Sequence, residues 1–149
     1  RVRAETFSYD EAARVAVYKG PLVIMTTSEG DIESRVLTLQ LAAATRTLDR
    51  MRAEGGEMPV YGRLSGSYEV VGDVLVYESA TETYTLNGRP AKVKAPEDVS
   101  SPGSGCKLSS SLLLTLNRRT GSVQVPGRGQ APRTTEVVRC DLNIRPGTK

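Results

Sequence analysis

The 149-residue chain contains no His and no Trp, and it has only one Phe and two Cys. Without His it lacks the usual general base and proton shuttle of enzymes, and the commonest metal ligand. Two Cys cannot supply the four Cys and His ligands of a structural zinc site. The composition therefore argues against a His-dependent enzyme and against a zinc-stabilised fold, and we expect neither a metal nor a cofactor.

Long uncharged stretches are also missing. The longest, residues 36–45 and 108–117, are ten residues each, whereas a membrane-spanning helix needs about 20 apolar residues. The length predicts a single domain, residues 1–149, large enough to bury its own core. The chain opens on Arg1 rather than Met, which is typical of a processed or excised segment.

The charge is nearly balanced, with 20 Lys and Arg against 17 Asp and Glu and a net charge of +3. A nucleic-acid-binding surface needs clustered cations interleaved with aromatic side chains. The densest cationic cluster, Arg118 and Arg119, has no aromatic residue near it, because the last aromatic residue is Tyr84. We therefore expect an ordinary, slightly basic surface and no nucleic acid partner.

Strand-forming residues are abundant: the chain has 16 Val, 14 Thr and 6 Tyr. Apolar residues alternate with polar ones in several segments, which is the pattern of half-buried strands. The Ala-rich segments 10–17 and 39–51 are better explained as strand–turn–strand than as helices. The expected one-face sets are Leu37, Leu39 and Leu41 in residues 31–41; Leu112, Leu114 and Leu116 in residues 108–116; and Val123 with Val125.

Turn residues separate these segments at short intervals, including Asn87-Gly88 and Gly55-Gly56. Regularly spaced short strands of this kind favour an all-β, antiparallel architecture. The longest irregular segment, residues 95–105, contains two Pro and two Gly. The first strand (residues 2–9) and the last (about 134–144) are the expected sheet edges, where unpaired backbone groups invite a partner strand.

An internal repeat accounts for most of the chain. At a shift of 68 residues, Tyr9 superposes on Tyr77, Asp10 on Glu78 and Gly20 on Gly88; beyond the 95–105 insertion the shift becomes 77, and the Leu37-Thr-Leu triplet falls on Leu114-Thr-Leu. Repeats of this kind stack side by side. The sequence predicts two units of about four strands each, residues 1–60 and 61–127, followed by a terminal strand.

Two motifs resemble the OstA/LptA-like repeat of lipopolysaccharide transport. One is Ala-Glu-x-x-x-Tyr-Asp, starting at Ala4 and extending to Tyr18-x-Gly20. The other is Ile32-Glu-Ser-x-x-Leu-x-Leu, continued by Leu48-x-x-Met-x-Ala-x-Gly. The resemblance implies a β-jellyroll-like stack of antiparallel strands folded into a V-shaped trough. It also implies a periplasmic location and edge-to-edge joining with other such domains, or with a second copy, between the inner-membrane transporter complex and the outer-membrane translocon.

A trough of this kind would hold acyl chains of lipopolysaccharide or a related glycolipid. The chain has few bulky apolar residues, so two curved sheet faces can leave an apolar groove between them. Alternatively, the same residues can pack into a closed sandwich with a dry core. Arg side chains at the groove mouth would meet phosphates or sugar carboxylates. The groove candidates are Leu37, Leu39, Leu41, Leu112, Leu114, Leu116, Val123 and Val125, and the phosphate or sugar candidates are Arg50, Arg52, Arg118 and Arg119.

Cys106 and Cys140 lie on either side of the Val123 strand. In the oxidising periplasm that the resemblance implies, two such Cys usually pair, whereas in a reducing compartment they would be buried thiols.

Two alternatives to a lipid conduit remain at the level of sequence. The first is a non-catalytic scaffold that polymerises through its strand edges and carries no lipid. The second is a paired-carboxylate hydrolase, with acids drawn from Glu29, Asp31, Asp73 or Glu78. Because all four acids lie at turns, where acids are common for structural reasons, the sequence does not favour an enzyme.

Overall fold

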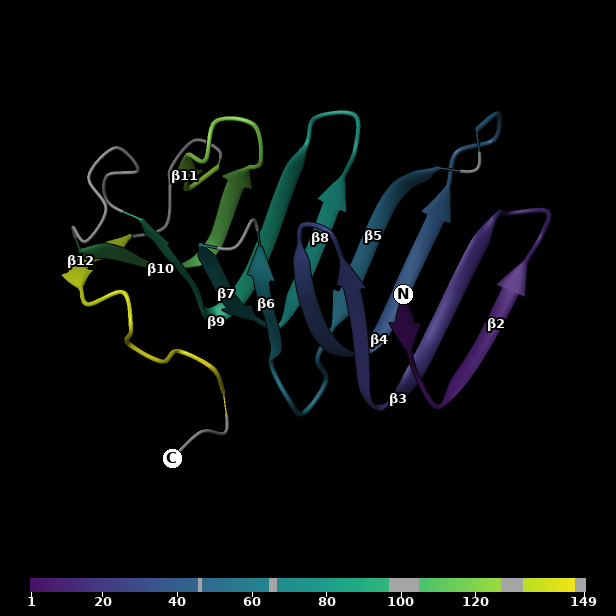
Figure 1. The fold of residues 1–149 in the computed structure, drawn as a ribbon, viewed down its shortest axis with the longest axis horizontal. Helices are drawn as coiled ribbons and strands as arrows, with labels where there is room; N and C mark the ends of the chain where they lie inside the picture. The colour runs from purple at the N-terminus through teal and green to yellow at the C-terminus, as the bar shows by residue number, and fades with distance from the viewer. Residues whose placement is uncertain (46, 65–66, 97–104, 127–132, 147–149) are drawn as a thin grey trace.

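The computed structural model describes residues 1–45, 47–64, 67–96, 105–126 and 133–146, and these residues form strands, turns and loops without a helix. The all-β prediction is confirmed (Figure 1). The described part of the chain contains no helix long and apolar enough to cross a membrane. The strands are β1 (Val2–Arg3), β2 (Thr6–Asp10), β3 (Val15–Thr27), β4 (Gly30–Leu41), β5 (Leu48–Glu54), β6 (Val60–Leu64), β7 (Tyr68–Gly72), β8 (Val74–Glu78), β9 (Thr83–Pro96), β10 (Cys106–Asn117), β11 (Val123–Gln124) and β12 (Thr134–Val138).

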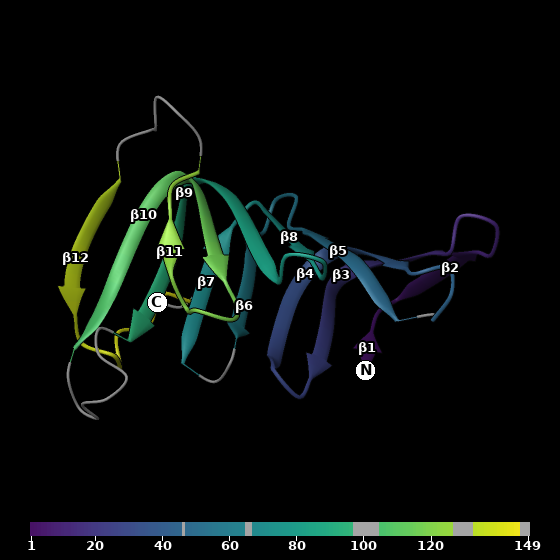
Figure 2. The same ribbon diagram turned by 90° about the horizontal axis from the view of Figure 1, so that it is seen from above.

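Four long strands, β3, β4, β9 and β10, each contribute to two sheets. The pairing register shifts midway along β3–β4 and along β9–β10, so each half of a long strand has different neighbours. One sheet, called sheet I, has the order β2-β3-β4-β5-β8-β9-β10-β11, and the other, sheet II, has the order β1-β3-β4-β6-β7-β9-β10-β12. All pairs are antiparallel, and the strands curve into a V-shaped trough, as predicted (Figures 1 and 2).

Apolar rows run across the inner faces of both sheets and form the core. Register partners place Phe7, Tyr18, Leu37, Ala53, Leu75, Leu86 and Leu114 in one row of sheet I. A parallel row contains Tyr9, Ala16, Leu39, Met51, Tyr77, Tyr84, Leu116 and Val123. Sheet II faces them with Val2, Met25, Ile32, Gly62, Val70 and Val93. Burial of these rows supplies the main driving force for joining the two sheets.

The turns of two equivalent hairpins, β2–β3 and β8–β9, adopt the same unusual backbone conformation. Arg14, before β3, has φ 56°, and Glu82, before β9, has φ 51°. A non-glycine residue in this left-handed region is uncommon. The two positions are separated by the 68-residue shift of the sequence repeat. The repeat boundaries near residues 60 and 127 stay a prediction, and residues 97–104 and 127 lie outside the described residues.

Both terminal strands differ from the prediction. The expected first strand over residues 2–9 is two strands, because β1 joins sheet II and β2 joins sheet I, with Ala4 and Glu5 between them. The expected last strand over residues 134–144 ends at Val138. Residues 139–146, called here the C-terminal strap, leave the sheet edge and cross the outer face of sheet II, where Lys94 and Glu33 bind them.

Candidate functional site

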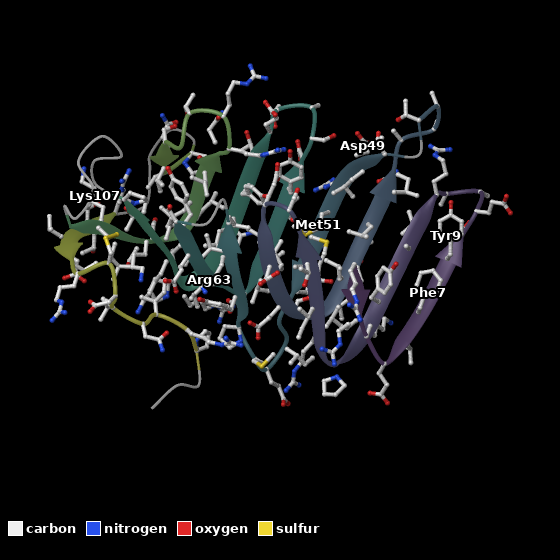
Figure 3. All side chains as sticks on the ribbon, viewed as in Figure 1. Phe7, Tyr9, Asp49, Met51, Arg63 and Lys107 are labelled. Atoms are coloured by element: carbon white, nitrogen blue, oxygen red, sulfur yellow. A yellow bond between two sulfur atoms is a disulfide. The ribbon has the colours of Figure 1, made fainter. Side chains whose placement is uncertain are left out.

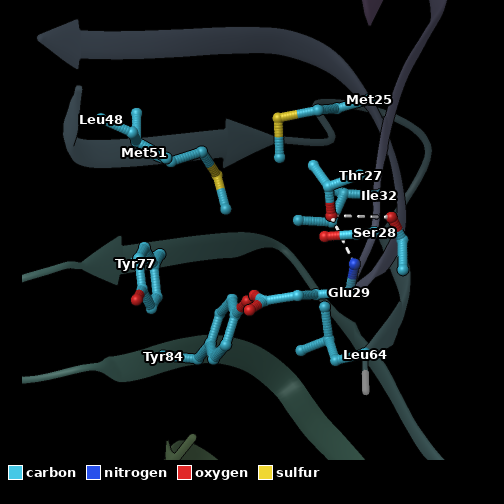
Figure 4. A pocket seen from close by; sticks show the side chains of 11 residues that line it. Met25, Thr27, Ser28, Glu29, Ile32, Leu48, Met51, Leu64, Tyr77 and Tyr84 are labelled. Atoms are coloured by element: carbon cyan, nitrogen blue, oxygen red, sulfur yellow. Dashed lines mark hydrogen bonds between the residues drawn. The ribbon is translucent and has the colours of Figure 1, made fainter. Parts of the chain in front are cut away.

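An apolar pocket of about 110 Å³ opens between the two sheets (Figure 4). Sheet II contributes Met25, Ile32 and Leu64 to its wall, and sheet I contributes Leu48, Met51, Tyr77 and Tyr84. The β3–β4 turn, with Ser28 and Glu29, forms its rim. The pocket therefore lies at the mouth of the trough, where the two inner faces separate.

Two tyrosines form one wall of this pocket. The rings of Tyr77 and Tyr84, which are register partners on β8 and β9, lie 4.6 Å apart between centroids. Burial raises the pKa of Tyr84 to about 12. Burial, and to a lesser extent the Glu82 carboxylate, raises the pKa of Tyr77. Both hydroxyls are therefore neutral at physiological pH, and the wall presents aromatic surface rather than charge.

Polar contacts cross the mouth between the two sheets. The guanidinium of Arg118, in the β10–β11 turn of sheet I, forms an ion pair with Glu29 on the β3–β4 turn of sheet II. Arg118 Nη1 also donates to the Tyr77 hydroxyl at 3.1 Å. Farther along, the Tyr68 hydroxyl donates to the carbonyl oxygen of Gly121 at 3.3 Å. Two polar contacts, Glu29–Arg118 and Tyr68–Gly121, therefore link the two sheets at the mouth, whereas the four long strands run continuously through the apex of the V.

The hydrogen bond between Tyr68 and Gly121 requires a glycine at position 121. Gly121 has φ 74°, and a Cβ built on it would lie 2.3 Å from the Tyr68 hydroxyl oxygen. A larger residue would therefore both strain the turn and displace Tyr68.

Most of the predicted groove leucines and valines lie on the inner face. Leu37 and Leu114 are fully buried, and Leu116 is almost so. Leu39, Val123 and Val125 are half-buried and pack against the core. Leu41 follows a register shift in the β4–β5 pairing, is half-buried and lies outside this core cluster. Pairing at Leu37–Ala53 and Leu114–Leu86 places these residues in the inner row of sheet I.

Leu112 is an exception, and its predicted place in the groove is wrong. Its side chain is 60% exposed. The register of β10 shifts between Ser111 and Leu113, where the strand passes from sheet II to sheet I. The inner-face positions change there from Ser109 and Ser111, which pair with Val93 and Ala91, to Leu114 and Leu116, so the two-residue period is interrupted at Leu112. The same change of phase occurs in β4, where Ile32 and Ser34 are followed by Leu37 among the buried positions.

The four predicted Arg side chains do not gather at one site. Arg50 and Arg52 alternate with buried Met51 and Ala53 on β5, so they lie on the outer face of sheet I, around a surface hollow shared with Gln40. This placement contradicts their predicted position at the groove mouth. Arg119 forms an exposed ion pair with Glu82 at 2.6 Å. Only Arg118 combines a position at the mouth with a contact to a pocket residue, Tyr77.

Several inner-face residues were not among the sequence candidates, although their signal was present. Met51 shares the inner face of β5 with Ala53, and Tyr77 and Tyr84 belong to the strands that flank the second repeat turn. Phe7 and Tyr9, labelled on β2 in Figure 3, share the inner side of sheet I, yet they are 60% and 46% exposed. The Phe7 ring contacts that of Tyr18 at 4.9 Å. The inner apolar row therefore continues uncovered to the β2 end of the trough.

The structure joins Cys106 and Cys140 by a disulfide, with an S–S distance of 1.98 Å. The bond attaches the start of the C-terminal strap to β10. We expect the purified protein to show no thiol before reduction and two alkylated cysteines after it, by intact-mass measurement. Two alkylated cysteines without reduction would contradict the pairing.

No family model and no curated protein sequence matches the chain. Among solved structures, the fold is similar to the crystal structure of LptH, described as the LptA homologous periplasmic component of the conserved lipopolysaccharide transport device from Pseudomonas aeruginosa. The TM-score is 0.69 at 16% sequence identity, and the alignment covers 90% of this chain and 92% of LptH. The chain therefore has the fold of an LptA-like β-jellyroll trough.

Among the described residues, no group of three or more His, Cys, Asp or Glu lies close enough together to hold a metal ion.

Proposed function

We propose that the chain is a non-catalytic, periplasmic member of the OstA/LptA-like family that conveys lipopolysaccharide or a similar glycolipid between the inner and outer membranes. The observation that carries this proposal is the apolar pocket at the mouth of a trough whose inner faces are lined with Leu, Met, Val and Tyr. The fold likeness to LptH supports it. Hydrocarbon transferred to such a surface gains about 0.8 kcal/mol per buried CH₂.

The pocket is too small to hold a long acyl chain in the closed structure. At about 110 Å³ the pocket is smaller than the roughly 150 Å³ cavity that accommodates a benzene molecule. A long acyl chain therefore requires the two sheets to separate at the mouth. Besides the apolar packing around the pocket, the contacts that resist this separation at the rim are polar and partly exposed, with Glu29 and Arg118 side chains 35% and 34% accessible. They cost less to break than the packed core at the apex.

The two ends of the sheets supply surfaces for joining other modules. All five residues of β2 are exposed, and among the strands that the structure describes β2 has only β3 as a neighbour. At the opposite end, β11 and β12 each pair with β10 and with no other described strand. Such edges can accept a strand from another chain. The proposed partners are LptA-like domains of the inner-membrane transporter complex and the outer-membrane translocon, or a second copy of this chain.

The closed part of the core supports the second candidate, a scaffold that assembles through the same edges without cargo. Leu37, Ala53, Leu75 and Leu114 are all fully buried, and such packing needs no ligand to complete it. Self-association is expected of both candidates, so cargo contact is the property that separates them.

A photo-crosslinking experiment tests cargo contact. A photoreactive amino acid at Leu39, which lies in an inner apolar row of sheet I, is expected to yield adducts with lipopolysaccharide in the periplasm. The same substitution at Thr38 is the matched control. Thr38 directly precedes Leu39 on β4 and faces outward, beside Arg52. Adducts at Leu39 and not at Thr38 support the conduit. The absence of adducts at both, in variants that fold and accumulate normally, would favour the scaffold.

A further inference from the structure

The Glu29–Arg118 ion pair differs from its neighbours because its two members come from different sheets and meet beside the pocket. Arg119, the next residue, has its partner Glu82 on the adjacent β8–β9 turn of the same sheet. The backbone N–H of Arg118 donates to the Glu82 carbonyl oxygen at 2.8 Å, so the sheet I side of the pair is firmly placed. Opening the mouth at this point therefore separates Glu29 from Arg118.

The Glu29 side of the pair is an ordered turn whose carboxylate reaches into the pocket. The Glu29 N–H donates to Thr27 Oγ1 at 3.1 Å, and this hydroxyl donates to the Gly30 carbonyl oxygen at 3.2 Å. Figure 4 shows the carboxylate directed towards the rings of Tyr77 and Tyr84. Because the turn is held by its own hydrogen bonds, it keeps its shape when the carboxylate gives up Arg118. The carboxylate thus occupies space that an anionic group could take instead.

We propose that Arg118 is an anion-exchange site at the groove mouth. The phosphate or carboxylate of an amphiphile replaces the Glu29 carboxylate on Arg118, and its acyl chain enters the pocket beside Met51 and Tyr84. This inference rests on the proposed function, and it names the headgroup chemistry and the residue that recognises it. The exchange keeps the guanidinium paired throughout, which avoids the cost of leaving a half-buried charge without a partner.

The choice of an anionic amphiphile follows from the two surfaces that meet at this point. Arg118 provides a planar set of N–H donors suited to phosphate and carboxylate oxygens. The pocket wall beside it is apolar or neutral aromatic: Met25, Ile32, Leu48, Met51, Leu64, Tyr77 and Tyr84. A small hydrophilic anion would gain only the contact with Arg118, and a neutral lipid would gain only the contact with the apolar wall. An anionic amphiphile gains both contacts, because its headgroup binds Arg118 and its acyl chain binds the wall.

Binding of a fluorescent fatty acid, 11-(dansylamino)undecanoic acid, to the purified chain tests this site. Its methyl ester serves as the neutral probe. Arg118→Gln is expected to weaken binding of the acid by about tenfold or more, the value of a hydrogen bond to a charged group, and not to weaken binding of the ester. Arg118→Lys is expected to restore part of the loss. Arg119→Gln is the control, since it removes the neighbouring cation whose partner lies on the same sheet.

Glu29→Gln tests the exchange itself. Removing the competing carboxylate is expected to tighten binding of the acid about two- to fivefold, because a partly exposed ion pair is worth up to about 1 kcal/mol. Unchanged affinity in Glu29→Gln, or equal losses in the Arg118→Gln and Arg119→Gln variants, would overturn the proposal. Inorganic phosphate distinguishes a lipid headgroup from a free anion: displacement of the probe by phosphate as effective as that by unlabelled fatty acid would also overturn it.

The binding tests on the Arg118 variants and the crosslinking test of the proposed function can fail independently of each other. Lipopolysaccharide adducts at Leu39 together with unaltered binding in the Arg118 variants would leave the conduit standing and remove the anion-exchange site. Thermal unfolding of each variant checks that the compared proteins are folded, and the ester provides a second check that the pocket is intact.

Discussion

Replacement of Lys94 by Met is expected to lower the free energy of unfolding by about 3–5 kcal/mol, the usual cost of removing one partner of a buried ion pair. Lys94 lies on the outer face of β9, and its side chain is only 3% exposed. Its ammonium group contacts Glu69 Oε1 at 2.7 Å and the carbonyl oxygens of Cys140 and Leu142 at 2.7 and 2.5 Å. All three N–H donors of the ammonium group therefore have acceptors.

The cost is high because Glu69 and the two carbonyl oxygens lose the buried ammonium group that donates to them. Glu69 also accepts a hydrogen bond from the Tyr61 hydroxyl at 2.8 Å, but that neutral contact does not balance its charge. The C-terminal strap loses its two backbone contacts with β9 and is then held by the Cys106–Cys140 bond and by Arg145. Arg145 contacts both carboxylate oxygens of Glu33 and lies over the Tyr61 ring at 5.1 Å.

Chemical denaturation of the wild type and of Lys94→Met measures this effect. Lys92→Met is the matched control, because Lys92 lies two residues away on the same face of β9 and is half-buried. We expect the control to change stability by about 0.5 kcal/mol or less. Equal losses in the two variants would mean that the buried contacts of Lys94 contribute nothing specific.

The pH dependence of the difference provides an independent check. Burial acts to raise the pKa of Glu69, but hydrogen bonds from Lys94 and Tyr61 outweigh it, and the net pKa is lowered from 4.5. A carboxylate with a lowered pKa in the folded state stabilises the fold above its unfolded pKa, and this contribution disappears as the pH falls through the lowered value. The gap in stability between wild type and Lys94→Met should therefore be largest near neutral pH and should shrink below about pH 4.5, where protonation removes the unpaired charge in the variant.

Alternation along single strands was sufficient to find much of the inner face. Leu37, Leu39, Leu114 and Leu116 were identified because each lies within a regular half-strand, where side chains point to the same face every second residue. Regular alternation ends where a strand passes between sheets, since the phase changes at the bend and nothing in the residues around Leu112 marks it. Arg50 and Arg52 alternate with Met51 in the sequence, and this alternation places them on the face opposite the groove.

Contacts between segments that are distant in the chain could not be predicted from local sequence patterns. The path of the C-terminal strap across sheet II decides that Lys94 is buried, and no local pattern around Lys94 distinguishes it from Lys92. Likewise, Glu29 looked like an ordinary turn acid, and only the closeness of the β3–β4 and β10–β11 turns gives it Arg118 as a partner. Such pairs depend on how two curved sheets approach each other, which periodicity does not encode.

Paired alanine substitutions at Leu114 and Leu112 test the bend in β10 directly. Leu114 is fully buried in the inner row of sheet I, so Leu114→Ala is expected to cost about 2–5 kcal/mol of unfolding free energy, the range for a core leucine. Leu112 is 60% exposed, so Leu112→Ala should change stability by about 0.5 kcal/mol or less. Both variants remove the same atoms from residues two apart on one strand, and chemical denaturation of each measures the difference. A regular strand would place both side chains on the same face, so similar large losses would show that β10 runs without the register shift and that Leu112 lines the groove after all.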